Sequence, residues 1–495
     1  MNKGKDIFLQ IKNKLVLLAA VSAGLYPLIN LYKSNHTLLA SWYQFVGLMF
    51  IFIGLPILVF TVIILIANSF ESLKKYRIQI LTFMNLAVFA CLIVRGSYGF
   101  NKKLLLAVFL IMFALSFVLK KHIKKIIKFQ FLLAVVGLFF MIPVLSKYLN
   151  YNSDWKTQID HIESVKFKTK PNIYFIQPDG YIGLSEIDKG NYRKDNSDFN
   201  AFLVDNDFKL YPKFRSNYYS TLSSNSSVFA MKHHYYNHSA DVDSELLFAR
   251  DVIIGDNPVL SILKNNGYKS NLIMENAYLL TSRPKNSFDY CNIDLNEIPI
   301  LTNGFGFKKD VTSDLEIALK NNGNSNNFYF IERIIPGHIA TLQSYTMGKE
   351  GERNKYLKKI DEANLWIKET LALIKKYDSN SLIVIAADHG GFVGYEYSSQ
   401  SHEKPKNRDN TYSMFSTLLA IKWTEDASQY DRDLNTSVNL FRTVFSFLSE
   451  DKSLLDNFED DRSYLKVSEG APLGIYEVID DNDNMVFEEL EKDKN

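Results

Sequence analysis

The sequence predicts an α/β protein with about five N-terminal transmembrane helices, followed by a mostly parallel sheet that helices cover on both faces. Two observations predict this. Apolar residues dominate the first third of the 495-residue chain, and the remainder alternates short apolar runs with amphipathic segments. A chain of this length exceeds one ordinary domain. We expect a transmembrane domain over 1–149, a linker over 150–170, a soluble domain over 171–450 and an acidic tail over 451–495.

The first third contains five apolar stretches, where a short membrane helix needs roughly 17 residues, and the fourth stretch is marginal by this measure. They cover residues 15–31, 43–67, 78–94, 104–119 and 129–145. Basic clusters precede the first stretch and follow the second and fourth, which places these loops in the cytoplasm and the soluble domain outside it. A short loop with Arg95, Lys102 and Lys103 goes against this pattern. If the fourth stretch did not span, the soluble domain would be cytoplasmic.

Charge and cysteine content exclude several classes of function. The net charge of +2 gives no reason to expect a nucleic-acid partner. Cys91 lies in an apolar segment and Cys291 in a polar one, so neither a structural disulfide nor a thiolate zinc site is expected. The apolar stretches contain no Asp or Glu, so we expect the helices to act as an anchor or lipid-facing platform rather than as a transporter.

Beyond residue 171 the patterns predict alternating strands and helices. Apolar, β-branched runs predict strands over 172–177, 269–274, 327–335, 381–387 and 416–423. Amphipathic or capped segments predict helices over 197–206, 258–266, 354–377 and 438–448. The acidic tail contains a short candidate strand over 474–478, and its end is expected to be disordered.

Three of the predicted strands end in residues that can bind a metal. Asp179 follows the first strand, His338 follows the strand over 327–335, and Asp388 with His389 follows the run over 381–387. The carboxyl ends of parallel strands meet at one edge of a sheet, where α/β proteins bind ligands. A carboxylate oxygen beside an imidazole suits zinc or manganese. The alternative is a strand followed by an ordinary polar turn.

The segment 216–227 is rich in hydroxyl side chains. Such a segment is typical of a polar loop. Beside a divalent metal it has a second interpretation, because a metal can lower the pKa of a hydroxyl and direct it at a phosphorus or sulfur centre.

Three motifs together resemble the alkaline phosphatase superfamily: NIYFIQPDGY at 172–181, SNYYST at 216–221 and IAADHGG at 385–391. They are most similar to the sulfatase-like branch, which holds lipoteichoic acid synthases and lipid A phosphoethanolamine transferases. The resemblance covers about 171–450, and five membrane spans before an extracytoplasmic catalytic domain also look like these enzymes. It implies that 171–450 is a sulfatase-like catalytic domain.

The resemblance assigns roles by position. Asp179, Asp388 and His389 would bind one divalent ion, with Mn²⁺ or Zn²⁺ favoured and Mg²⁺ as an alternative. Thr221 would be the nucleophile, forming a covalent phospho-enzyme and also contacting the metal. His338 would contact the substrate or a second metal ion.

His402 matches a further histidine that some members use at the metal site, with a surface histidine as the alternative. Gly183 stands near a position where many relatives have a basic residue. Three hydroxyls remain rival nucleophiles: Ser220, Ser223 and Ser224. We assign no role to His233 and His234 and expect them at the surface.

The resemblance implies an integral-membrane, metal-dependent phosphotransferase in a bacterial cytoplasmic membrane. A phospholipid would donate a phosphoglycerol or phosphoethanolamine group, which would pass through phospho-threonine to a cell-envelope glycan or lipid. Sulfatases carry a Cys/Ser-x-Pro-x-Arg motif, which is absent around Thr221 and Cys291. The first alternative is therefore an extracytoplasmic phosphoric-ester hydrolase, with a sulfuric ester less favoured. A second alternative is a non-catalytic membrane scaffold.

Overall fold

The computed structural model describes residues 3–235, 245–321 and 325–490, and the side chains from residue 13 onward. The chain divides into two compact units, Met1–Tyr151 and Asn152–Asn495. The unit boundary falls just after the predicted end of the transmembrane domain. Each unit is described by itself.

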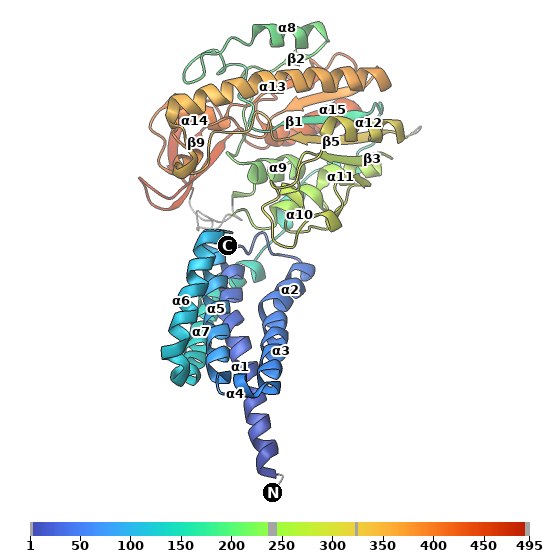
Figure 1. The fold of residues 1–495 in the computed structure, drawn as a ribbon. Coiled ribbons are helices and arrows are strands. Elements are labelled where there is room, and N and C mark those ends of the chain that lie inside the picture. The colour runs from blue at the N-terminus through green and yellow to red at the C-terminus, as the bar shows by residue number, and fades with distance from the viewer. Residues whose placement is uncertain (1–2, 236–244, 322–324, 491–495) are drawn as a thin grey trace. The chain divides into compact units, whose positions relative to one another are not determined.

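The first unit consists of helices (Figure 1). They are α1 (Lys3–Ser34), α2 (Trp42–Met49), a π-helical turn (Phe50–Gly54), α3 (Leu55–Ser69), α4 (Glu71–Lys74), α5 (Arg77–Tyr98), α6 (Lys102–Leu119) and α7 (Ile123–Leu149). Apolar side chains on α1, α3, α5 and α7 form a small core. Many other large apolar side chains remain exposed, as expected for helices that face lipid.

Four helical segments of the described residues are long and apolar enough to cross a membrane, where the sequence predicts five. They are Asn13–Ser34, Trp42–Ser69, Arg77–Tyr98 and Lys102–Lys156. The counts differ because the last segment is 55 residues long and contains both the fourth and the fifth predicted stretch. A 3₁₀ turn at Lys120–His122 separates its two parts, α6 and α7.

The second unit contains a seven-stranded sheet in the order β2-β7-β6-β1-β5-β3-β4. The strands are β1 (Ile173–Pro178), β2 (Lys209–Leu210), β3 (Lys269–Met274), β4 (Tyr290–Cys291), β5 (Asn327–Arg333), β6 (Leu382–Ala386) and β7 (Leu419–Lys422). Neighbours from β6 to β4 are parallel, and β7 is antiparallel to both β6 and β2. The predicted mostly parallel sheet is confirmed.

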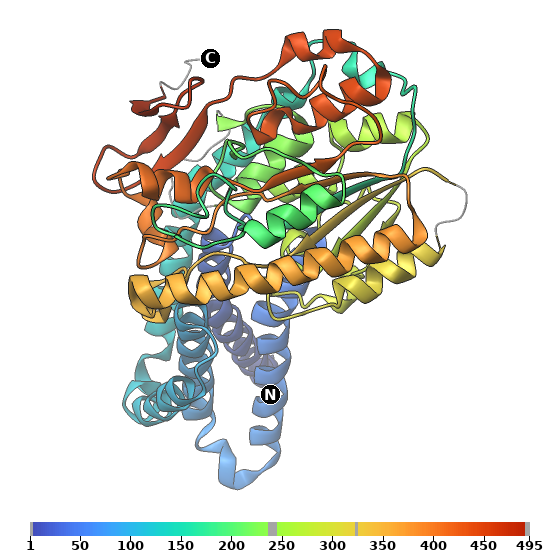
Figure 2. The ribbon, with the colours of Figure 1, turned by 90° about the horizontal axis from the view of Figure 1, so that it is seen from above.

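Helices cover both faces of this sheet. Alternate strand residues point to opposite faces, so each buried strand contributes apolar side chains to both. Ile173 and Phe175 of β1 join a core with α9 (Thr221–Ala230), α10 (Ala249–Ile254), α11 (Pro258–Asn265) and α15 (Leu440–Ser449). Tyr174 and Ile176 join a second core with α8 (Ser197–Asp205), α12 (Val311–Asn321), α13 (Gly348–Tyr377) and α14 (Arg408–Phe415). Figure 2 shows the long orange helix α13 on one side of the sheet and the red α15 on the other.

Two segments that the sequence predicts as a linker and a tail are folded parts of the second unit. In the predicted linker, Ile162, Val165 and Phe167 are buried in the first of these cores. The predicted tail supplies an antiparallel sheet of β8 (Ser463–Val467), β9 (Gly474–Ile479) and β10 (Met485–Glu489). β9 matches the predicted strand, and its last four residues, 476–479, are buried. The expectation of disorder at 491–495 lies outside the described residues.

Candidate active site

The acidic residues of the site follow the carboxyl ends of two central strands. β1 lies between β5 and β6, so residues that follow these strands emerge at the same edge of the sheet. Asp179 comes directly after β1, and Asp388 and His389 come two and three residues after β6. Parallel pairing thus brings together residues that are about 200 positions apart in sequence.

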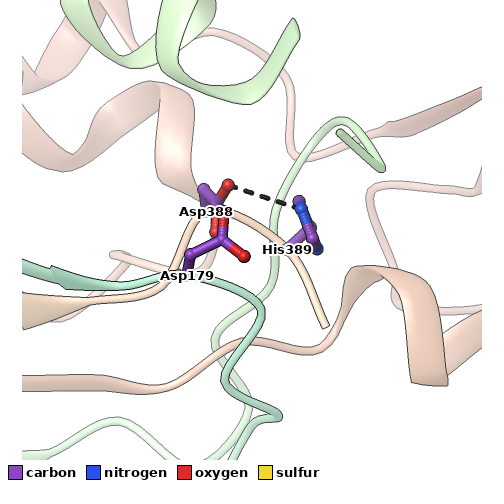
Figure 3. Close-up of side chains that lie close together, drawn as sticks. All are labelled: Asp179, Asp388 and His389. Atoms are coloured by element: carbon purple, nitrogen blue, oxygen red, sulfur yellow. Dashed lines mark ion pairs between the residues drawn. The ribbon is translucent and has the colours of Figure 1, made fainter. Parts of the chain in front are cut away.

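Asp179, Asp388 and His389 form a cluster that can hold a metal ion. One ligand atom from each residue lies within 4.8 Å of the others, and all three side chains are buried. Asp388 Oδ2 is 3.5 Å from His389 Nε2 (Figure 3). Two carboxylates and one imidazole form a donor set that suits zinc or manganese best, and magnesium is an alternative.

A carboxylate oxygen without a hydrogen bond within the cluster fits a bound cation. Asp388 Oδ1 accepts a hydrogen bond from the Gly180 backbone N–H at 3.1 Å. Among the described residues, Asp388 Oδ2 is buried and has no hydrogen-bond partner. A buried carboxylate oxygen left without a donor is costly, whereas a divalent cation would complete its coordination.

The electrostatics of the cluster point the same way. Burial, reinforced by the Asp388 charge, raises the pKa of Asp179 to about 7. Burial alone would lower the pKa of His389, but the charges of Asp388 and Asp179 outweigh it and raise that pKa overall. Both shifts reflect the cost of placing two buried carboxylates side by side, and a metal cation would offset that repulsion as a proton does.

Thr221 places a hydroxyl on this cluster. Its Oγ1 donates a hydrogen bond to Asp179 Oδ2 at 3.1 Å and lies 3.3 Å from His389 Nε2. Thr221 is also the first residue of α9, at the positive end of that helix dipole. Backbone N–H groups at such an end stabilise a bound phosphate.

Packing, rather than helix propensity, explains why the serine-rich segment forms α9. Phe229 of α9 packs against Phe175 of β1 and Phe330 of β5. At the other end, His234 stacks on Tyr218 with ring centroids 4.1 Å apart, and its Nε2 lies 2.7 Å from the Ser223 carbonyl oxygen. These contacts fix the turn that presents Thr221.

The expectation that His233 and His234 lie at the surface is wrong, since both are buried. Burial lowers the pKa of His234 to about 3, so this imidazole is neutral and can donate one N–H to the Ser223 carbonyl. The paired histidines follow α9 directly, and that proximity to the hydroxyl-rich segment was the one available sequence signal.

Tyr356 supports the loop after β1. The sequence predicts only that this residue lies within a helix. Its hydroxyl donates to the Gly180 carbonyl oxygen at 2.7 Å and accepts from the Ile182 N–H at 3.1 Å. Gly180 has φ +69°, and a Cβ there would lie 2.4 Å from the Gly337 oxygen. This loop therefore needs glycine, and its N–H reaches Asp388 only in this conformation.

A cavity of about 460 Å³ opens onto the cluster. Its lining includes five predicted site residues, namely Asp179, Thr221, His338, His389 and His402. The His338 ring centroid is 6.0 Å from that of His389, and the His402 ring is edge-on to Tyr219 at 5.8 Å. Neither histidine joins the three-residue cluster, so both are placed to contact a ligand in the cavity.

The rival hydroxyls are engaged elsewhere. Ser220 Oγ donates to Ser223 Oγ at 3.2 Å, and Ser224 Oγ lies 2.8 Å from Ser216 Oγ. The geometry also explains Gly183, because a Cβ there would lie 2.2 Å from Ser416 Oγ and 3.0 Å from the Thr417 nitrogen. A long basic side chain has no room at that position.

Comparison with known families agrees with this geometry. Residues 213–449 match the family model described as Sulfatase. The match lies within the second unit and agrees with the resemblance of the sequence motifs, and Asp179 lies before the matched range. No curated protein sequence matches the chain.

Several solved structures are similar at low identity. The periplasmic domain of EptC from Escherichia coli, in complex with zinc, is 12% identical, covers 63% of this chain and 93% of its own, and has a TM-score of 0.41. The integral membrane lipooligosaccharide phosphoethanolamine transferase A from Neisseria meningitidis is 13% identical, with coverages of 88% and 95% and a TM-score of 0.40.

A protein from a Bacteroides thetaiotaomicron locus for glycosaminoglycan metabolism is 13% identical, with coverages of 63% and 84% and a TM-score of 0.42. Identities of 12–13% and TM-scores of 0.40–0.42 leave the function to be argued from the site itself.

Proposed function

We propose that this protein is an integral-membrane, metal-dependent phosphotransferase that uses Thr221 as its nucleophile. One observation carries the proposal: the Thr221 hydroxyl lies within hydrogen-bond distance of two members of a buried Asp-Asp-His cluster, one of whose carboxylate oxygens has no hydrogen bond among the described residues. A nucleophile next to a metal site is the arrangement that attack on a phosphoester requires.

Asp179, Asp388 and His389 would hold the divalent ion. The donor set favours zinc or manganese, with magnesium as an alternative. When bound, the ion supplies positive charge that balances the phosphoester oxygens and favours ionisation of a nearby hydroxyl. The loop around Gly180, held by Tyr356, keeps Asp388 Oδ1 in place.

Thr221 Oγ1 would attack the phosphorus of the donor, forming a phospho-threonine and breaking the bond to the lipid alcohol, which leaves as diacylglycerol. The N-terminal amides of α9 would bind the phosphoryl oxygens. An acceptor hydroxyl would then attack the same phosphorus and release Thr221. His338 and His402 line the cavity and would position donor or acceptor.

The first unit would hold this site next to its lipid donor. Lys120, Lys121, Lys124, Lys125 and Lys128 surround the junction of α6 and α7. If Lys102–Lys156 crossed the bilayer once, these five charges would fall within the segment, at high cost. We therefore infer two spans with the junction in the cytoplasm, five spans in all, and an extracytoplasmic catalytic domain in a bacterial cytoplasmic membrane.

Hydrolysis is the second candidate, since the matching family model is that of sulfatases. The first half-reaction would be the same, with water as the acceptor. The absence of the Cys/Ser-x-Pro-x-Arg motif and the position of Thr221 favour a phosphoric over a sulfuric ester. A cell-envelope glycan or lipid acceptor distinguishes the transferase from this alternative.

The full chain in detergent, supplied with a divalent metal and phospholipids labelled in the acyl chains, tests the proposal by release of labelled diacylglycerol. Replacing Thr221 with Ala should lower turnover by about 10³-fold or more, since activity then lacks its nucleophile, with metal content unchanged. Ser220→Ala serves as the matched control and should retain turnover. Full turnover in Thr221→Ala would contradict the proposal.

A further inference from the structure

Lys359 of α13 is a cationic residue that has no role in the reaction proposed above. It lines the cavity together with Asp179 and Thr221. A Cβ built on Gly337 would lie 3.9 Å from Lys359 Nζ, so the ammonium group sits against the loop that precedes His338. The side chain thus crosses from α13 to the edge of the sheet where the metal cluster lies.

Within the described chain, no hydrogen bond or ion pair engages Lys359 Nζ. Its side chain is half-buried, and burial lowers the pKa of the ammonium group. Half-buried cations elsewhere in this unit include paired ones, Lys232 with Glu459 and Lys194 with Asp361. A half-buried, unpaired ammonium is unfavourable, and an anion bound in the cavity would stabilise it.

The charges of the cavity lining favour one kind of substrate. Of the described residues that line it, Lys359 is the only Lys or Arg and Asp179 is the only carboxylate. Asp179 belongs to the metal cluster and accepts from Thr221, so no carboxylate remains for a substrate ammonium group. The lining does offer hydroxyls from Thr341, Ser398, Ser399 and Ser401, which suit a polyol.

Aromatic rings are the other way to hold an ammonium group. Tyr278 lines the cavity, but the Arg250 guanidinium already lies over its ring, 4.8 Å from the centroid. The same ring stacks on Phe305 with centroids 4.9 Å apart. The Phe392 ring is edge-on to His338 and His389. These rings are engaged with positively charged or titratable groups, which disfavours a further cation beside them.

We propose that Lys359 binds an anionic phosphoester oxygen of the donor and sets the specificity of the cavity for transferred groups without positive charge. Phosphoglycerol would be preferred over phosphoethanolamine. This assignment rests on the proposed phosphotransferase function. Lys359 would contribute a charge-assisted hydrogen bond, and its field would oppose an ammonium group in the same cavity.

Binding of inorganic phosphate tests the first part without any turnover. Isothermal titration of the full chain in detergent, with and without added zinc, should show roughly tenfold weaker binding for Lys359→Gln than for wild type. Lys358→Gln is the matched control, an exposed lysine one position away on α13, and should bind like wild type. Lys359→Arg should retain binding. Equal phosphate affinities for wild type and a folded Lys359→Gln would overturn the assignment.

Donor preference tests the second part. Vesicles with equal amounts of phosphatidylglycerol and phosphatidylethanolamine should give wild type a higher kcat/KM for phosphatidylglycerol, and Lys359→Glu should lower that ratio about tenfold or more. A wild-type preference for phosphatidylethanolamine would overturn the specificity. Consumption of neither donor would contradict the proposed function, whereas the phosphate titration would still decide whether Lys359 binds the anion.

Discussion

Two buried polar clusters, one in each unit, differ in whether their hydrogen bonds are satisfied. In the first unit, Ser22, Asn85 and Gln130 join α1, α5 and α7. Asn85 Nδ2 donates to Gln130 Oε1 at 2.8 Å, Gln130 Nε2 donates back to Asn85 Oδ1 at 3.0 Å, and Ser22 Oγ donates to Gln130 Oε1 at 2.8 Å. The cluster is uncharged and its amide groups are paired.

In the second unit, Asp179, Asp388 and His389 are as deeply buried, but Asp388 Oδ2 has no hydrogen-bond partner among the described residues and two carboxylates lie close together. A satisfied polar network stabilises the packing of its elements, whereas an unsatisfied charged one indicates a missing ligand. The difference teaches that unmet bonding capacity, rather than burial of polar groups, separates the candidate metal cluster from the satisfied polar cluster of the first unit.

Removing one charge from the second cluster should have the largest effect. Asp388→Asn keeps the shape of the side chain but removes the charge of a proposed metal ligand. Metal affinity should therefore fall by about 10- to 100-fold, and turnover should fall with it. Metal content per chain, measured by inductively coupled plasma mass spectrometry after dialysis, checks this. Glu425→Gln, at an exposed carboxylate of the same unit, should leave metal content unchanged.

Unchanged metal stoichiometry in Asp388→Asn would remove this residue from the metal site. The missing hydrogen bond at Asp388 Oδ2 would then need another explanation than a bound metal ion.

A smaller effect on metal affinity is expected for Tyr356, which contacts the loop beside the cluster rather than the cluster itself. Tyr356→Phe removes the hydroxyl that bridges the Gly180 carbonyl and the Ile182 N–H. The free energy of unfolding should fall by about 1–2 kcal/mol, and metal affinity should fall about tenfold as the loop loosens. Chemical denaturation and metal titration measure the two effects.

Tyr377→Phe is the matched control, because its hydroxyl lies on the same helix but bonds to the exposed Glu316. If Tyr356→Phe and Tyr377→Phe bind metal equally well, the tyrosine does not position the metal loop.

The smallest effect is expected in the satisfied cluster. Asn85→Leu should lower the stability of the first unit by about 1 kcal/mol, the size typical of a hydrogen bond between membrane helices. Metal content should not change. Unfolding in mixed detergent checks the stability, with Thr61→Val at an exposed position of α3 as the control. A loss of metal in Asn85→Leu would contradict the separation of structural and functional clusters.

Much of the sheet was predictable because its central strands are continuous apolar runs. The prediction over 269–274 coincides with β3, and those over 172–177 and 381–387 match β1 and β6 within one residue at each end. The candidate ligand residues were predictable for the same reason, since a polar residue directly after a buried strand stands out. The pairing of Asp179 with Asp388 then follows from parallel strand order alone.

What the sequence could not supply depends on tertiary contacts. Serine has modest helix propensity, and the segment after Thr221 becomes α9 because Phe229 packs onto the sheet. The acidic residues around β8–β10 suggested a tail, but alternate apolar residues such as Leu465 and Val478 fill the second core. Tyr356 and Lys359 were unremarkable positions on an amphipathic helix until the fold turned them toward the site.

Mass spectrometry of the full chain, after brief incubation with divalent metal and phospholipid, tests most directly whether Thr221 carries the transferred group. The account predicts a mass increase equal to the phospho-group of the donor, mapped by digestion to Thr221 and absent from Thr221→Ala. An adduct on Ser220 or Ser223 instead, or an undiminished adduct in Thr221→Ala, would contradict it.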